Sequence, residues 1–199
     1  MLLFVPLFIF HAAGPLDFWW WMSLNIVLAV GLGAALDRSY LPACCGDLRS
    51  GPGRKIALGL LASAGLYAVF FVGNVLARKI LPFAGAGIGA VYGFKSSASL
   101  ARIVVLMTLL IGPGEEVFWR GFLQRRWQER FGPDRGFLAA TALYTAVHAG
   151  SGNAMLVIAA AVCGLFWGYL YRRTGSLLLV VVSHTAWDLA VFVLFPFGA

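Results

Sequence analysis

Five ionisable side chains lie inside long apolar stretches of the sequence. They are Glu115, Glu116, His148, His184 and Asp188. An acidic side chain inside an apolar span costs a few kcal/mol to insert into a membrane, so it faces the interior of a helix bundle and usually marks function. One such residue has a structural explanation, a buried group satisfied by a neighbouring carbonyl. Five of them in three helical segments favour a common polar site.

The spacing of these residues places them in pairs on helix faces. Three pairs are separated by four positions: Glu116 and Arg120, Tyr144 and His148, and His184 and Asp188. Side chains four residues apart meet on one side of a helix. We therefore expect Arg120 to keep Glu116 charged and to fix the helix that presents Glu115. Tyr144 either donates a hydrogen bond to the site or makes an aromatic helix contact.

A carboxylate and a histidine on either side of one water molecule can remove its proton. A second histidine and a polar side chain can then hydrogen-bond the oxyanion that forms when this water attacks an amide. We find no serine or cysteine placed as a nucleophile. The residues therefore predict a hydrolytic site inside the membrane, and the favoured mechanism needs no cofactor.

A divalent metal such as zinc is the alternative way to activate the water. In that case Glu115, His148 and His184 would be its ligands. The sequence has no His-Glu-x-x-His motif, which is the familiar signature of a zinc protease. The metal-free mechanism is favoured on that ground, and the choice between the two stays open.

The composition shows what kind of structure must position these residues. Of the 199 residues, 61% are hydrophobic and 12% are charged, against about 25% charged in ordinary soluble domains. The net charge of +7 does not indicate nucleic acid, because the basic residues form short clusters between apolar runs. Such clusters are typical of loops that flank membrane spans. Membrane lipids are the expected partners, and no nucleic acid is expected.

The apolar runs predict an all-α, polytopic transmembrane bundle of about six spans in one membrane domain, residues 1–199. The expected spans are 17–36, 56–77, a third that runs from 99 to 114 and is followed by a new helical segment at 115–130, 136–149, 154–171 and 176–195. We expect the third helix to break or kink at residues 112–114, Gly-Pro-Gly. Residues 37–55 are predicted to be a loop, and residues 81–94 a re-entrant or interfacial piece. Whether residues 1–13 form a further short span is left open.

The basic residues also predict an orientation. With six spans and the N-terminus outside, ten lie on one side (Arg38, Arg49, Arg54, Lys55, Arg125, Arg126, Arg130, Arg135, Arg172, Arg173) and four on the other (Arg78, Lys79, Lys95, Arg102). The positive-inside rule makes the first side cytoplasmic. Counting residues along the helices, we expect a cavity that is reached more easily from the cytoplasm.

The motifs themselves resemble those of a known family. The segments are EEVFWR at 115–120, YTAVH at 144–148 and HTAWD at 184–188. They resemble, in the same order, the Glu-Glu-x-x-x-Arg, Phe-x-x-x-His and His-x-x-x-Asn/Asp motifs of the CPBP intramembrane proteases, the family of CAAX proteases and bacteriocin-processing proteins. The resemblance covers the C-terminal half and implies a catalytic core at residues 99–196.

The resemblance implies a role for each residue. Glu115 and His148 would activate the water, and His184 and Asp188 would shape the oxyanion site, with Glu116, Arg120 and Tyr144 supporting them. Asparagine fits an oxyanion role better than aspartate does, because a carboxylate repels an oxyanion unless it is protonated. Asp188 therefore either orients His184 or marks a metal-binding variant. The family has been described both as glutamic proteases and as metalloproteases.

The implied activity is that of an intramembrane endopeptidase acting on a membrane-associated or lipid-modified protein or peptide. The small size suggests a multi-pass protein of a prokaryotic cytoplasmic membrane. Two other functions stay open: a non-catalytic bacteriocin-immunity or scaffold member of the same family, and a small proton-coupled transporter. Buried Glu, His and Asp side chains also line pumps, although no inverted repeat is evident.

Overall fold

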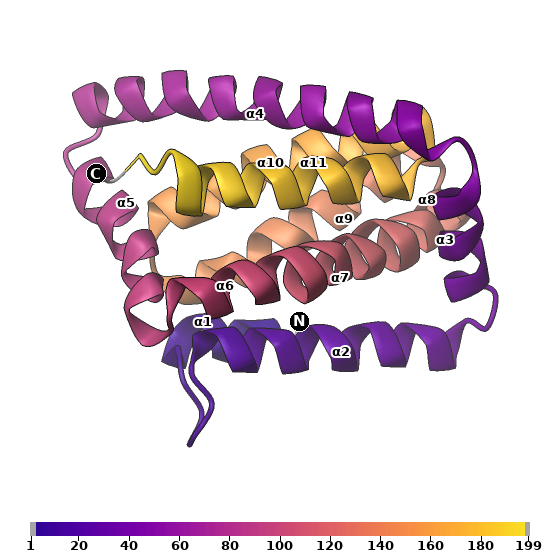
Figure 1. Cartoon of the computed structure of the whole chain (residues 1–199), viewed down its shortest axis with the longest axis horizontal. Helices are drawn as coiled ribbons and strands as arrows, with labels where there is room; N and C mark the ends of the chain where they lie inside the picture. Colours follow the sequence, from indigo (N-terminus) through magenta and orange to yellow (C-terminus); the bar gives the residue numbers. More distant parts are fainter. Residues whose placement is uncertain (1–2, 198–199) are drawn as a thin grey trace.

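The computed structural model describes residues 3–197, and the fold is built from helices alone (Figure 1). Four helices are long and apolar enough to cross a membrane: α2 (Phe18–Leu36), α4 (Pro52–Ile80), α10 (Ala154–Thr174), and α11 (Leu177–Leu189) with its continuation η5 (Ala190–Leu194). This confirms the predicted all-α, multi-pass membrane bundle.

The count of six spans was approximate. Within residues 3–197 the count is four, or five if the bent pair 84–97 and 100–131 forms one broken span. The predicted span 136–149 corresponds to α9 (Pro133–His148), which has 16 residues. A helix needs roughly 20 residues to cross a bilayer, so α9 is shorter than a full span.

We predicted a break or a kink at Gly-Pro-Gly, and the break is wrong, because residues 100–131 form one continuous helical rod. It consists of α6 (Leu100–Leu106), the π-helical stretch η2 (Met107–Ile111), α7 (Gly112–Glu116), a second π-helical stretch η3 (Val117–Gln124) and α8 (Arg125–Phe131). A π turn widens the helix, and local π adjustments can accommodate a proline without ending the helix. Glu115 and Glu116 therefore lie between two π-helical stretches, an arrangement common at functional sites.

The chain turns just before this rod. The short helix α5 (Ala84–Gly93), extended by a 3-10 turn at Phe94–Ser97, meets it at an angle of 99°. This agrees with the re-entrant or interfacial piece predicted at 81–94. Ser99 starts the rod by accepting a hydrogen bond from the Arg102 backbone N–H, as an N-cap does.

In the N-terminal part, the structure answers the question left open for residues 1–13 and corrects the loop predicted at 37–55. Helix α1 (Phe4–Phe10) has 7 residues, about 10 Å of helix, so it cannot cross the membrane. It packs instead against α2, α9 and the 3-10 turn that follows α9. The predicted loop 37–55 contains a helix, α3 (Tyr40–Arg49). The buried Tyr40 anchors it by donating a hydrogen bond to the Val117 carbonyl, 3.1 Å away.

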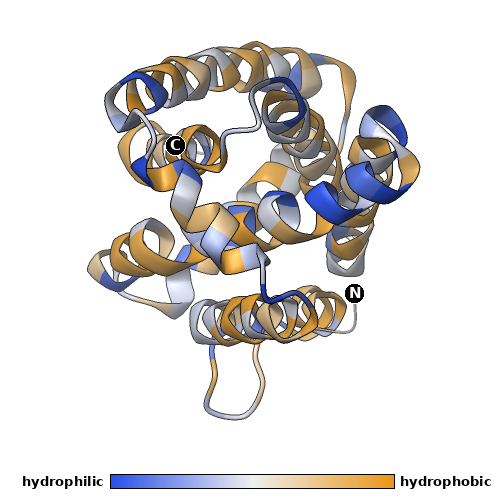
Figure 2. Cartoon of the chain, turned by 90° about the vertical axis from the view of Figure 1, so that its right-hand side faces the viewer, coloured by the Kyte–Doolittle hydropathy of each residue, from blue (hydrophilic) through white to orange (hydrophobic). Residues whose placement is uncertain are grey.

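The bundle is layered, with α4 along one side and α2 along the opposite side (Figure 1). The rod 100–131, α9, α10 and α11 lie between them (Figure 1), and the end-on view in Figure 2 shows hydrophobic residues on most of the helices. The inner group is the part that carries all three motifs.

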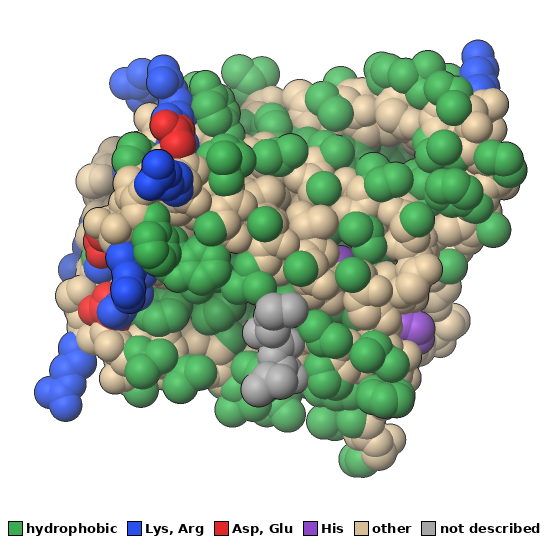
Figure 3. All heavy atoms as spheres, turned by 180° about the vertical axis from the view of Figure 1, so that it is seen from behind, with side chains coloured by type: hydrophobic (Ala, Val, Ile, Leu, Met, Phe, Trp, Pro, Cys, Tyr) green, Lys and Arg blue, Asp and Glu red, His purple; other side chains and the backbone are tan. Residues whose placement is uncertain are grey.

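The outer surface is that of a membrane protein. Hydrophobic side chains cover most of the face seen in Figure 3, and most of the Lys and Arg side chains in that view lie at one end. That end is formed by α3, the C-terminal ends of α2, α8 and α10, and the N-terminal ends of α4, α9 and α11 (Figure 1). The ten basic residues predicted to be cytoplasmic all belong to these segments. We refer to this as the basic end.

Small residues let α9 and α10 approach closely. Gly164 and Gly168 are one helical turn apart and buried. A Cβ atom on Gly168 would lie 2.9 Å from the Phe137 ring, and one on Gly164 would lie 3.1 Å from the Tyr144 ring. Glycine pairs of this spacing are the usual means by which membrane helices bring their backbones together. They set the distance between Tyr144 and the rest of the site.

We expect Gly168→Ala to destabilise the fold by about 1–3 kcal/mol, the usual cost of overpacking, because the Phe137 ring must move. Denaturant unfolding in detergent micelles would measure this cost. The matched control is Gly65→Ala on α4, where a Cβ atom would meet nothing within 4 Å and alanine improves helix propensity. Equal stability of the two variants would contradict close packing at Gly168.

Candidate active site

The four residues predicted to be catalytic lie around one cavity. Glu115, His148, His184 and Asp188 line a space of about 180 Å³ together with Tyr144. They come from α7, α9 and α11, the three helices that carry the motifs. The side chains of Glu115 and His184 are 8% and 6% exposed, and that of Asp188 is 13% exposed. The structure therefore brings the predicted site together in the bundle interior.

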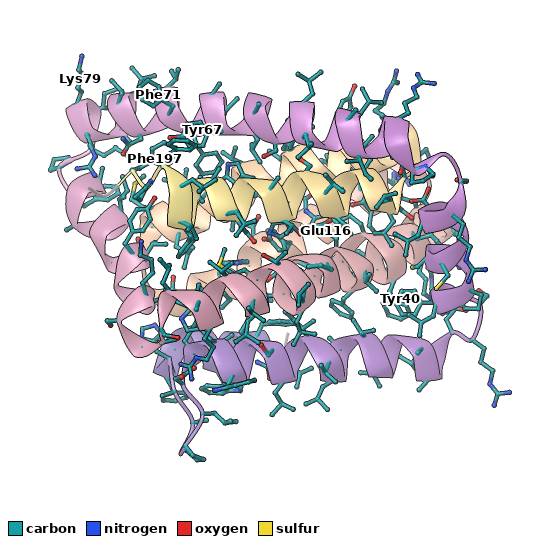
Figure 4. The ribbon with its side chains drawn as sticks, in the orientation of Figure 1. Tyr40, Tyr67, Phe71, Lys79, Glu116 and Phe197 are labelled. Carbon is teal, nitrogen blue, oxygen red and sulfur yellow. The ribbon has the colours of Figure 1, made fainter. Side chains whose placement is uncertain are left out.

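Glu116 lies at the centre of the polar cluster (Figure 4). Its Oε1 atom accepts a hydrogen bond from Arg120 Nη1 at 2.8 Å and is 2.7 Å from His184 Nδ1. The side chains of Glu116 and Arg120 are 0% and 3% exposed. The predicted ion pair with Arg120 is therefore present. The contact with His184, which is 68 positions away, adds a link between α7 and α11 that spacing could not reveal.

His184 is held on both nitrogens. Its Nε2 atom lies 3.4 Å from Asp188 Oδ2 and 3.9 Å from Glu115 Oε2. The imidazole stacks on the Trp167 ring, with 3.8 Å between ring centroids. Because a carboxylate can only accept, Nδ1 carries a hydrogen that it donates to Glu116. Asp188 thus contacts the histidine one turn before it, as expected of a residue that orients His184.

His148 is oriented by its own helix. Its Nδ1 atom lies 2.8 Å from the Tyr144 carbonyl oxygen, which can only accept, so Nδ1 carries the proton. The neutral ring then has its free lone pair on Nε2. Phe8 of α1 packs on the same imidazole, with 4.6 Å between ring centroids. The short N-terminal helix therefore fixes one wall of the site.

Tyr144 makes both of the contacts considered from the sequence. Its hydroxyl is 3.5 Å from Glu115 Oε2, at the long end of hydrogen-bonding distance. Its ring lies 4.8 Å from the His148 ring and 4.9 Å from the Arg120 guanidinium, between centres. Tyr144 thereby connects the first motif, through Glu115 and Arg120, to its own second motif.

Three residues of this region were not identified from the sequence. Gln124 is buried and donates a hydrogen bond to the Gly168 carbonyl at 2.8 Å, two turns beyond Glu116 on the same rod. Its spacing with Glu116 and Arg120, every fourth residue, was a signal that could have found it. Phe8 and Trp167 gave no such signal, because an aromatic residue in an apolar run is ordinarily a packing residue.

The polar side chains do not fit a metal ion as arranged. Among the residues that the structure describes, no three His, Cys, Asp or Glu side chains are placed to hold one. Of the predicted ligands Glu115, His148 and His184, the last already has a carboxylate beside each ring nitrogen. We therefore derive no step through a metal.

The cavity extends in the direction opposite to the one expected. Beyond the polar residues it is lined by Phe18 at the start of α2, Phe94 at the end of α5 and Leu156 at the start of α10. These residues lie at the end of the bundle away from the basic end (Figure 1). We expected easier access from the cytoplasm because we counted residues along the helices. Such a count does not show which end of the cavity is closed by side chains.

Comparison with known proteins agrees with the motifs. Residues 97–190 match the model of a family described as type II CAAX prenyl endopeptidase, Rce1-like. The match contains all three motifs and nearly the whole predicted core at 99–196. No curated protein and no solved structure gives a significant match.

We expect Arg120→Met to cost about 3–5 kcal/mol of stability, because it leaves the carboxylate of Glu116 buried without its cation. Combining it with Glu116→Gln should recover part of this loss, and a double-mutant cycle in detergent would measure the coupling. Arg126→Met is the control, since the Arg126 side chain is 46% exposed and exposed ion pairs contribute little. Additive effects at 116 and 120 would contradict a coupled pair.

Proposed function

Because the chain belongs, through residues 97–190, to the Rce1-like family of CAAX-type intramembrane proteases, we propose that it is an intramembrane endopeptidase in which Glu115 and His148 activate water. The observation that carries the proposal is the convergence of Glu115, His148, His184 and Asp188 on one buried cavity. A multi-pass membrane protein with such a cavity can hydrolyse a peptide bond away from bulk solvent. We further propose a prokaryotic cytoplasmic membrane as its location.

In the proposed reaction a water molecule attacks the peptide carbonyl, and Glu115 and His148, which both line the cavity, activate this water. A cavity of about 180 Å³ has room for a water molecule beside a peptide group, since a water occupies about 30 Å³ in the liquid. Glu115 or the free Nε2 of His148 takes one proton as the water oxygen bonds to the carbonyl carbon. The C–N bond then breaks, and the same proton passes to the leaving amine. Atoms and charge balance without a covalent enzyme intermediate.

His184 is the residue best placed to stabilise the oxyanion. Glu116 and Asp188 flank its two nitrogens, so a carboxylate lies beside each nitrogen that can carry a hydrogen. A protonated His184 can donate from Nε2 to a developing oxyanion. In this proposal Asp188 orients His184 and does not itself donate to the oxyanion.

The surroundings of the cavity support a membrane-associated or lipid-modified substrate. An apolar groove of about 230 Å³ runs beside it, between α4, α5, α10 and α11. The groove and the cavity share Val91, Ala159, Trp187 and Phe192 as lining residues. An apolar segment lying in the groove would bring the adjoining peptide bond next to the polar residues.

We expect Glu115→Gln to reduce peptide-bond cleavage at least about 100-fold, since it removes a general base while keeping the side-chain shape. Mass spectrometry of protein termini in membrane fractions would compare cells carrying the wild type and the variant. Glu129→Gln is the control, because its side chain is 63% exposed on α8, outside the cavity. Termini that vanish only with Glu115→Gln would establish proteolysis. Identical termini in all strains would instead favour a non-catalytic protein.

We expect the purified enzyme to retain its activity in the presence of metal chelators. The reason is that both nitrogens of His184 have carboxylate neighbours rather than an open coordination site. Cleavage of a substrate found by the termini comparison would be measured before and after treatment with 1,10-phenanthroline. Loss of activity that zinc restores would contradict the metal-free mechanism.

A further inference from the structure

A second, more polar pocket adjoins the catalytic cavity. It has a volume of about 290 Å³ and is lined in part by His11, Ser96, Ser97, Ser151 and Asn153. His11, Ser96 and Ser97 are exposed. We call this pocket the vestibule. It belongs to the end of the bundle opposite the basic end, where α5, the start of α2 and the start of α10 meet (Figure 1).

Three side chains lie between the vestibule and the cavity. Phe18, Phe94 and Leu156 line both spaces, and Phe18 and Phe94 are the two aromatic ones. Their rings are stacked, with 4.4 Å between centroids and 16° between planes. Phe94 is placed by its backbone, since its carbonyl accepts a hydrogen bond from Trp19 Nε1 at 3.0 Å. Rotation of these side chains alone would therefore change the opening between the two spaces without unfolding a helix.

Buried side chains fill the space on the basic side of the polar site, as far as the structure describes the chain. Between the polar site and that end, the rod contributes Arg120 and Gln124, which are 2% and 1% exposed. Arg120 Nη2 reaches the Gly164 carbonyl at 3.5 Å, and Gln124 Nε2 reaches the Gly168 carbonyl at 2.8 Å. These contacts bridge the rod to α10 across the space that a substrate arriving from the basic end would need.

We propose that the segment to be cleaved reaches Glu115 from the non-cytoplasmic face, through the vestibule and past the stacked rings of Phe18 and Phe94. This rests on the proposed function and deepens it. The substrate class becomes a peptide segment exposed on the outer side of the membrane, close to an apolar anchor. Cut sites found by comparing termini should accordingly lie in outward-facing parts of membrane proteins.

Thiol accessibility tests this route without requiring catalysis. Cys163 lines the cavity and is buried, so it serves as the reporter in a full-length Cys44→Ser, Cys45→Ser variant. The probe is 2-sulfonatoethyl methanethiosulfonate, which does not cross membranes. It is added separately to right-side-out and inside-out vesicles, and the modified fraction is measured by mass spectrometry.

We expect Cys163 to react several-fold faster in right-side-out vesicles, and Phe94→Ala to increase that rate further. Phe83→Ala is the matched control, because Phe83 is 48% exposed near the same end of the bundle and lines neither space. Faster reaction in inside-out vesicles would overturn the proposal. So would an absence of outside labelling that persists in the Phe18→Ala, Phe94→Ala double variant.

The orientation has its own control. With Cys163→Ala, the exposed Cys45 on α3 should react only in inside-out vesicles. Cys44→Ser is kept in this variant as well, so that Cys45 is its single thiol. Outside labelling of Cys45 would mean that the basic end is not cytoplasmic, and the proposal would fail. None of these results depends on whether Glu115 is catalytic.

Discussion

The arrangement of the site depends on one carboxylate oxygen, Glu116 Oε1, which contacts both Arg120 and His184 in the dry interior. A buried carboxylate is tolerated only when cations or donors surround it. Arg120 supplies the charge from one turn away on the same rod, and His184 supplies an N–H from α11. The oxygen therefore locks the register between two helices. His184 gains a fixed tautomer, and its Nε2 is left beside Asp188 and Glu115.

The neighbouring helices support this contact through packing. Gly164 and Gly168 allow α10 to come close enough for its carbonyls to accept hydrogen bonds from Arg120 and Gln124. Trp167, on the same helix, covers the face of His184. On the other side of the cavity, Phe8 covers His148. Each of the two histidines thus has an aromatic wall and a polar anchor, which holds its geometry while excluding bulk water.

Much of the fold followed from local pattern. Apolar runs bounded by basic clusters gave α2, α4, α10 and α11, because the thickness of a bilayer fixes the length of an apolar helix. The break expected at Gly-Pro-Gly was wrong, since a glycine and a proline have strong local preferences that neighbouring helices and π turns can override. Helix α3 was missed because a short, polar segment has no apolar periodicity that identifies it.

By itself, the sequence determined the class of protein and the residues of the site. Polar residues in spans, repeated at helical spacing, identified Glu115, Glu116, Arg120, Tyr144, His148, His184 and Asp188, because i,i+4 geometry is local. Only the tertiary structure decided which helix supplies each partner. It joined Glu116 to His184 across 68 positions, set Phe8 against His148, and left the cavity open toward Phe18 and Phe94. Such contacts depend on how closely helices pack, and that distance is decided by side chains from several segments at once.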